Sequence, residues 1–310
     1  MVRLDERLAQ GDVIIIDGGT GTELEARGVP MDEVAWCGAA NFDHDDVLLG
    51  VHEDYIRAGA DVIITNTFST ARHMLEPAGL GDRVVEANRR AVDIARKARD
   101  RAADRPVAIA GSISHFIGRT DRSRPPDAKW TRPETLKATF TEQAESLAGA
   151  GVDLIALEMM MRPELALPAL EAALGTGLPV WIGMSCRRED GQVVTFDHPD
   201  TAFAPVVEAL VAAAAGRAQA VNVMHSLVDD TQAGVDVVRA RWKGVLGVYP
   251  ESGYFEMPNW RFVDVIEPAA LVARAKAWVA SGVQIVGGCC GTGVAHIRAL
   301  KEALPRRIRA

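Results

Sequence analysis

Two adjacent cysteines near the end of the chain are the residues best suited to carry chemistry. Cys289 and Cys290 lie in the segment Gln-Ile-Val-Gly-Gly-Cys-Cys-Gly-Thr-Gly, residues 284–293. They are two of only four cysteines, and the glycines beside them let the backbone approach a ligand closely. Thiolate sulfur prefers zinc to the hard cations. The pair therefore predicts soft-metal chemistry at the end of a strand.

Short apolar runs alternate with longer segments of helical spacing along the whole chain. The expected strands are 13–17, 61–65, 107–111, 153–158, 179–185, 220–223, 244–248 and 284–287. The expected helices include 47–58, 84–100, 133–150, 163–174, 202–215 and 268–280. Continuous apolar strands are typical of a parallel sheet covered on both faces. Eight such units predict an α/β protein, a (β/α)8 TIM barrel forming a single domain over residues 1–310, with a doubly wound open sheet as the alternative.

In a barrel the residues that end the strands meet at one mouth, and here several of them are polar. They include the carboxylates Asp17 and Glu158 and the amides Asn66 and Asn222. Burying such groups without partners is costly, so a functional role explains the group best. The structural alternatives are that Asp17 caps a turn and that Asn222 binds backbone. Cys186, which ends the fifth strand, is expected to be a small buried hydrophobe.

Several other mechanisms and partners are excluded by what the sequence lacks. No lysine ends an expected strand, which argues against Schiff-base chemistry, and there is no P-loop or dinucleotide-binding glycine motif. The net charge is −8 and the basic residues are scattered, so no nucleic-acid partner is expected. No apolar stretch approaches the length of about 18 residues that a membrane span needs. With no signal peptide and no disulfide framework, the expected location is cytoplasmic.

A series of motifs resembles those of the homocysteine S-methyltransferase family, in the same order along the chain. They are Asp17-Gly-Gly-Thr-Gly-Thr-Glu-Leu24, His52-Glu-Asp-Tyr-Ile-Arg-Ala-Gly-Ala-Asp-Val-Ile-Ile-Thr-Asn-Thr-Phe68, Ala150-Gly-Val-Asp-Leu-Ile-Ala-Leu-Glu158, Val221-Asn222, Tyr249-Pro-Glu-Ser-Gly253 and Gly287-Gly-Cys-Cys-Gly-Thr292. The resemblance covers residues 13 to about 300. It implies the same barrel and a role in methionine biosynthesis.

The resemblance implies an enzyme that moves a methyl group to the thiol of homocysteine or a similar acceptor. The donor would be a sulfonium such as S-methylmethionine or S-adenosylmethionine, or a related onium compound. Family members hold zinc through three cysteines, and no catalytic residue is implied beyond the metal-activated thiol. The acceptor would be bound by Asp17, Gly18, Gly19, Glu158 and Asn222. The partners are thus a small-molecule thiol acceptor and a methyl donor; the oligomeric state is left open.

One expected zinc ligand is missing, because Val223 follows Asn222 where the family has a cysteine. His225 could replace that cysteine and give a Cys289, Cys290 and His225 site. If the strand continues, His225 would lie on the same face as residue 223. Alternatively Cys186 could complete the site, or no zinc binds. The alternative function is accordingly a metal-free, non-catalytic homologue that binds or senses a small molecule.

Aromatic residues in the expected mouth loops form a further hypothesis. Trp36, His115, Phe116, Trp130 and Tyr254 could line the donor pocket or simply anchor loops. An aromatic wall suits a cationic methyl group because the faces of the rings attract positive charge.

Overall fold

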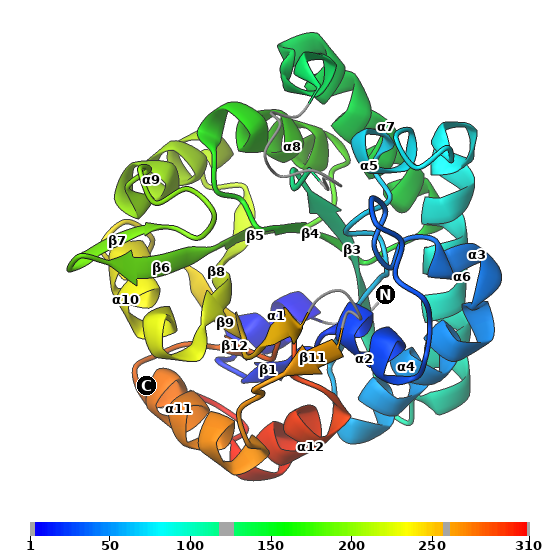
Figure 1. The fold of residues 1–310 in the computed structure, drawn as a ribbon. Helices are drawn as coiled ribbons and strands as arrows, with labels where there is room; N and C mark the ends of the chain where they lie inside the picture. The colour runs from blue at the N-terminus through cyan, green and yellow to red at the C-terminus, as the bar shows by residue number, and fades with distance from the viewer. Residues whose placement is uncertain (1–3, 118–126, 257–260, 309–310) are drawn as a thin grey trace.

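The computed structural model describes residues 4–117, 127–256 and 261–308. Eight parallel strands form the inner ring and the main helices lie outside it (Figure 1). The strands are β1 (Ile14–Ile15), β2 (Val62–Ile64), β3 (Ala108–Ser114), β4 (Leu154–Glu158), β5 (Val180–Met184), β8 (Ala218–Leu227), β9 (Val245–Glu251) and β12 (Ile285–Val286). Their order is β1-β12-β9-β8-β5-β4-β3-β2. The predicted TIM barrel is confirmed, and the open-sheet alternative is wrong.

A helix packs outside each consecutive pair of strands, as the periodicity predicts. These helices are α4 (Asp45–Ala58), α6 (Val84–Ala102), α7 (Pro133–Ala150), α8 (Pro163–Gly175), α9 (Phe203–Ala214), α10 (Val228–Arg239), α11 (Pro268–Ala280) and α12 (Val294–Ala303). Pro133, Pro163 and Pro268 occupy first turns, where a missing N–H costs little. Gly59 and Gly151 end α4 and α7 in the left-handed conformation that glycine tolerates.

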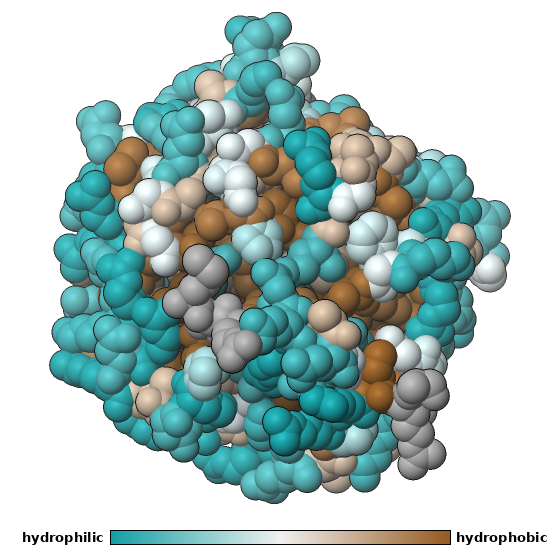
Figure 2. All heavy atoms as spheres, turned by 180° about the vertical axis from the view of Figure 1, so that it is seen from behind, coloured by the Kyte–Doolittle hydropathy of each residue, from teal (hydrophilic) through white to brown (hydrophobic). Residues whose placement is uncertain are grey.

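Alternate residues of each strand pack into two different cores. Ile63, Ile155 and Val223 face outward, against the helices. Ile14 and Trp181 fill the barrel interior. The interior is closed at the amino ends of the strands by α1 (Leu4–Ala9), whose Leu4 and Leu8 join the same cluster. Figure 2 views the molecule from the side opposite to Figure 1. Hydrophobic side chains lie toward the middle of that side, within a hydrophilic rim.

The barrel closes at a seam between β1 and β2 that ordinary ladder bonds cover only in part. One bridge joins Ile16 to Val62, and Asp61 N–H donates to Ile15 O. Two carboxylates supply the remaining bonds. Asp61 Oδ2 accepts from Ile15 N–H at 3.0 Å, and Asp17 Oδ2 accepts from Ile64 N–H at 2.7 Å. Side chains therefore complete the ring where the two backbones do not.

Two hairpins that the sequence reading did not predict follow strands at the mouth. The first consists of β6 (Cys186–Glu189) and β7 (Gln192–Thr195), and the second of β10 (Tyr254–Glu256) and β11 (Arg261–Val263). In Figure 1 the β11 strand of the second hairpin is drawn in front of the inner ring, whereas the β6–β7 hairpin points outward beside α9 and α10. The shorter elements are α2 (Thr20–Ala26), α3 (Ala40–Asp43), α5 (Arg72–Leu75) and the 3-10 turns Gly81–Arg83 and Ala128–Thr131. Part of the long connection after β3, residues 118–126, lies outside the described residues.

None of the helices in the described ranges is both long enough and apolar enough to cross a membrane.

Candidate active site at the barrel mouth

Three potential metal ligands converge at the mouth of the barrel. Cys289 Sγ lies 3.4 Å from His225 Nδ1 and 4.0 Å from Cys290 Sγ. Within the described part of the chain, Cys289, Cys290 and His225 are the group whose ligand atoms all lie within 4.8 Å of one another. All three are partly exposed, so a small molecule can reach them. The structure thus brings His225 to the cysteine pair.

An irregularity in β8 turns His225 toward the mouth. The register between β8 and β9 shifts between Met224 and Leu227, which marks a bulge. His225 itself has a φ of 42°, a left-handed conformation that costs a residue other than glycine about 1–3 kcal/mol. Simple alternation would have placed it on the same face as Val223. Strain of this kind is typical of functional sites, where surrounding structure maintains it.

Val223 and Cys186 point away from this cluster. Both are fully buried in the core between the barrel and its helices. A Cβ added to Gly234 of α10 would come within 3.0 Å of Val223 and would collide with Cys186 Sγ. The hypothesis that Cys186 completes a metal site is therefore wrong, because its thiol faces α10. The expectation that His225 shares the face of Val223 is also wrong, because the bulge rotates it.

The two separations from Cys289 Sγ to the other ligand atoms are close to those of a tetrahedral metal site. Bonds of about 2.3 Å to sulfur and about 2.0 Å to nitrogen place tetrahedral ligands about 3.5–3.8 Å apart. The separations of 3.4 and 4.0 Å bracket that range. The hydrogen bond with Cys290 and burial hold the pKa of Cys289 well above its usual value. A bound cation reverses that balance, since a coordinated thiol is deprotonated.

A carboxylate supports the far side of the histidine ring. Glu251, the last residue of β9, places Oε2 3.1 Å from His225 Nε2. The Phe196 ring packs edge-on against the same imidazole at 5.0 Å. Burial would lower the pKa of His225, but the charges of Glu251 and Cys289 outweigh it and raise the pKa to about 9.

The two carboxylates predicted from the strand ends lie deeper in the mouth. Glu158 ends β4 with 7% of its surface exposed, and Ser112 Oγ donates a hydrogen bond to its Oε2. Burial raises the pKa of Glu158 to about 7, although the Ser112 hydrogen bond opposes this rise. Asp17 is fully buried, and burial raises its pKa well above the usual value despite its bond to Ile64 N–H.

Several buried polar atoms near these carboxylates have no hydrogen-bond partner among the described residues. They are Asp17 Oδ1, both amide atoms of Asn222 and the hydroxyl oxygen of Tyr249. The charges of Glu158, Cys289 and Asp17 all act on the Tyr249 hydroxyl, so the four groups share one neighbourhood. Leaving a buried polar atom unpaired costs about 1–3 kcal/mol. Such a cluster is explained if a polar ligand supplies the missing partners.

The remaining predicted site residues have largely structural partners. A Cβ on Gly18 would collide with Thr292 O, and one on Gly19 would lie 2.7 Å from Cys289 O. Gly19 N–H already donates to Thr292 O at 2.9 Å. These two glycines therefore seat the cysteine loop against β1. Asn66 donates to Cys37 O and Asn41 Oδ1, so it anchors a loop.

Two of the aromatic residues considered for the donor pocket, Trp36 and Phe116, both contact Phe68. The Trp36 and Phe68 rings meet edge to face at 6.1 Å, and Phe68 lies 5.9 Å from Phe116. His115 is buried, and its Nε2 accepts from Met161 N–H at 2.9 Å. Two other predicted members do not join this cluster. Trp130 packs on His73, and Tyr254 is 57% exposed on β10.

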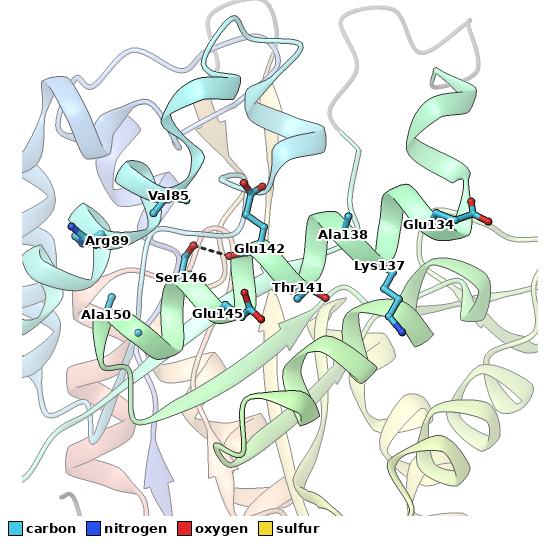
Figure 3. A pocket seen from close by; sticks show the side chains of 11 residues that line it. Val85, Arg89, Glu134, Lys137, Ala138, Thr141, Glu142, Glu145, Ser146 and Ala150 are labelled. Atoms are coloured by element: carbon cyan, nitrogen blue, oxygen red, sulfur yellow. Dashed lines mark hydrogen bonds between the residues drawn. The ribbon is translucent and has the colours of Figure 1, made fainter.

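A separate groove of about 800 Å³ lies outside the barrel between α6 and α7. Figure 3 shows Glu134, Lys137 and Glu145 along α7 and Arg89 on α6. Its lining includes neither a thiol nor an imidazole, and it does not reach the mouth. The chemistry of the cysteines therefore belongs to the barrel mouth.

Sequence reasoning did not identify three residues that the site geometry singles out. From the sequence, Tyr249 and Glu251 stand out only as members of the motif Tyr249-Pro-Glu-Ser-Gly253, and Ser112 belongs to none of the motifs. The register pairs Ser114 with Glu158, and alternation along β3 then places Ser112 on the same face as Glu158. The contact between Glu251 and His225 depends on the bulge in β8, which no local motif marks.

Comparison with known proteins gives a consistent result. A family model described as homocysteine S-methyltransferase matches residues 14–304. The chain is 30% identical to the homocysteine S-methyltransferase of Escherichia coli strain K12, covering 95% of this chain and 96% of that one. It is 28% identical to a selenocysteine methyltransferase of Astragalus bisulcatus, covering 95% and 93%. The oxidized form of the E. coli homocysteine methyltransferase MmuM superposes with a TM-score of 0.76, at 26% identity, covering 95% and 97%.

Proposed function

Because the chain belongs to the homocysteine S-methyltransferase family, we propose that it methylates the thiol of homocysteine or a closely similar acceptor, giving methionine. It is an enzyme of the thiol methyltransferase class. The convergence of Cys289, Cys290 and His225 at the mouth is the observation that carries the proposal for this chain. It also favours catalysis over the metal-free alternative, since a binding protein needs no such group.

We propose that Cys289, Cys290 and His225 hold a zinc ion. Two thiolates and one imidazole form an accepted catalytic zinc set that leaves a fourth position open. A bound zinc ion would lower the pKa of the acceptor thiol and keep the resulting thiolate in place. The spacing of the ligand atoms and the support of His225 by Glu251 are both consistent with this assignment.

The acceptor is expected to be an amino acid that is recognised by its polar end. Asp17 and Glu158 would accept hydrogen bonds from its ammonium group. The unpaired atoms of Asn222 and Tyr249 would supply further partners, and the turn at Gly18 and Gly19 would border the same space. The low polarity around Glu158 makes each such bond stronger than it would be in water.

The transfer itself is a displacement that needs little covalent help from the protein. The acceptor sulfur attacks the methyl carbon, the bond from that carbon to the donor sulfonium breaks, and the donor leaves as a neutral thioether. The thiol proton passes to solvent. The chain's contribution is alignment, which supplies much of the rate in reactions of this kind. We propose that Trp36, Phe68 and Phe116 face the cationic donor.

Metal analysis combined with activity tests the proposal. Protein purified without chelators should contain about one zinc per chain. Cys289→Ser, Cys290→Ser and His225→Ala should each lower zinc content and methyl transfer together. Cys186→Ala is the matched control, because its thiol is buried against α10 and should leave both unchanged. Normal zinc content and activity in all three site variants would refute the zinc site.

We also propose a cytoplasmic location. All four cysteines are free, and thiols that must stay reduced to bind metal suit a reducing compartment.

A further inference from the structure

The imidazole of His225 is engaged on both sides by groups of different kinds. Nδ1 faces Cys289 Sγ at 3.4 Å, and Nε2 faces Glu251 Oε2 at 3.1 Å. An imidazole that binds a metal must be neutral and carries one proton, so one nitrogen binds the metal while the other donates. A carboxylate can only accept when it is ionised. The proton therefore belongs on Nε2, which leaves the lone pair of Nδ1 directed at the cysteine pair.

Glu251 is held in this contact by the strand pair that carries the bulge. It is paired with Leu227, on the far side of the register shift from Met224. The side chains of His225 and Glu251 are only 16% and 10% exposed. In the part of the chain that is described, the structure pairs Glu251 with no basic group other than His225. A buried carboxylate with a single partner is expected to have a specific role.

We infer that Glu251 is a positioning residue that fixes the tautomer and orientation of His225 for metal binding through Nδ1. This inference rests on the proposed function, since it concerns the same site. Residues that hydrogen-bond to metal-ligating histidines orient the ring and increase its basicity, and their loss typically weakens metal binding about 10–100-fold. His225 needs such support because its backbone conformation is strained.

The test measures metal affinity in variants of Glu251. Co²⁺ and Zn²⁺ affinities would be determined by competition with a chelator, for Glu251→Ala and Glu251→Gln. Glu251→Ala should weaken binding about 10–100-fold. Glu251→Gln keeps an oxygen acceptor for Nε2–H and should recover part of the loss. The control is Glu208→Gln, which removes an ion pair between Glu208 of α9 and Arg241 in the turn after α10, and it should bind metal like the wild type.

Spectroscopy separates a positioning role from a general loss of structure. The Co²⁺ spectrum of Glu251→Gln, at saturating metal, should retain the bands of a site with two thiolates and one imidazole. The melting temperature of the metal-free variant should stay close to that of the metal-free wild type. The wild type, in which Glu251 is intact, should show an imidazole contribution in its Co²⁺ spectrum. Its absence would contradict the assignment of His225 Nδ1 as a metal ligand.

His225→Ala distinguishes failure of this inference from failure of the proposed function. If His225→Ala loses metal but Glu251→Ala and Glu251→Gln bind with wild-type affinity, the positioning role is wrong and the metal site stands. If His225→Ala itself binds metal with wild-type affinity, the proposed ligand set is wrong, and the role of Glu251 fails with it.

Discussion

At the scale of single residues, Glu158 shows how a binding group can be costly to the fold. Burial raises its pKa from 4.5 to about 7. Compared with the unfolded chain, the folded protein therefore favours the protonated form of Glu158. Binding an ammonium group requires the ionised form. The resulting penalty is absent below about pH 4.5 and is complete once the pH exceeds about 7.

Replacing Glu158 with Gln should therefore stabilise the protein and impair its function. Each pKa unit between 4.5 and 7 corresponds to about 1.4 kcal/mol. The free energy of unfolding at pH 8 should therefore rise by at most about 3 kcal/mol in the variant. At pH 4.5 the gain should nearly vanish. Urea unfolding at both pH values measures the difference. The KM for the acceptor should rise at least about tenfold, as for a lost charged partner. Equal stability of the two proteins at pH 8 would contradict the burial penalty.

Tyr249 offers a second contrast between stability and binding. Its hydroxyl is buried and has no partner among the described residues. Tyr249→Phe should leave the free energy of unfolding unchanged or raise it by up to about 1 kcal/mol, while the KM for the acceptor rises about tenfold. Tyr55→Phe is the control, since the Tyr55 hydroxyl donates to Thr292 O and its loss should only destabilise. An unchanged KM in Tyr249→Phe would exclude the hydroxyl from acceptor binding.

At the scale of elements, close approach of β1 and β12 determines where the cysteines lie. A Cβ added to Gly287 would overlap the Ile16 side chain and lie 2.9 Å from Asp17 O. Gly287→Ala should therefore push the two strands apart, destabilise the fold by about 1–3 kcal/mol and lower zinc affinity. Thermal unfolding and metal titration measure both effects.

Gly149→Ala is the matched control for this element. Gly149 lies within α7 with nothing within 4 Å of an added Cβ. The substitution should stabilise the protein by about 0.4–1 kcal/mol, because alanine restricts the unfolded chain. If Gly287→Ala behaved like Gly149→Ala, contact between the strands would not be what holds the cysteine loop.

The elements also show which features a sequence can predict. Most strands and helices follow from periodicity, because a covered parallel strand must be apolar throughout. Asp17, Glu158 and the cysteine pair follow from their positions at strand ends. The turn of His225 toward the mouth depends on a bulge, and its partner Glu251 comes from a neighbouring strand. Such features depend on register between strands, which local patterns do not encode.

At the scale of the whole molecule, the seam between β1 and β2 is where the ring is most dependent on side chains. Asp61 is 2% exposed and bonds Ile15 N–H, while Arg7 and Lys301 approach it at 3.1 and 3.2 Å. It thereby ties β2 to β1, to α1 and to α12.

Asp61→Asn should destabilise the whole barrel rather than one part of it. Removing the charge takes the carboxylate partner from Lys301 and one of two carboxylates from Arg7, which keeps Asp12 at 3.2 Å. The loss of these charged hydrogen bonds should cost about 1.5–3 kcal/mol. Glu171→Gln, which breaks an exposed pair with Lys137, should cost at most about 1 kcal/mol. Urea unfolding followed by two probes should show one cooperative transition for Asp61→Asn. A loss as small as that of Glu171→Gln would contradict the role of the seam.

The order of the site residues along the chain matters for how the enzyme could be recombined with its relatives. The carboxylates Asp17 and Glu158 lie at the ends of β1 and β4, whereas His225, Glu251 and the cysteine pair lie in or directly after β8, β9 and β12, later in the chain. The acidic contacts to the acceptor therefore come from one stretch of the chain, and the proposed metal ligands come from a later stretch that also carries Asn222 and Tyr249. A chimaera joined between β4 and α8 would exchange the two carboxylates while keeping the proposed metal ligands, which offers a route to new acceptors.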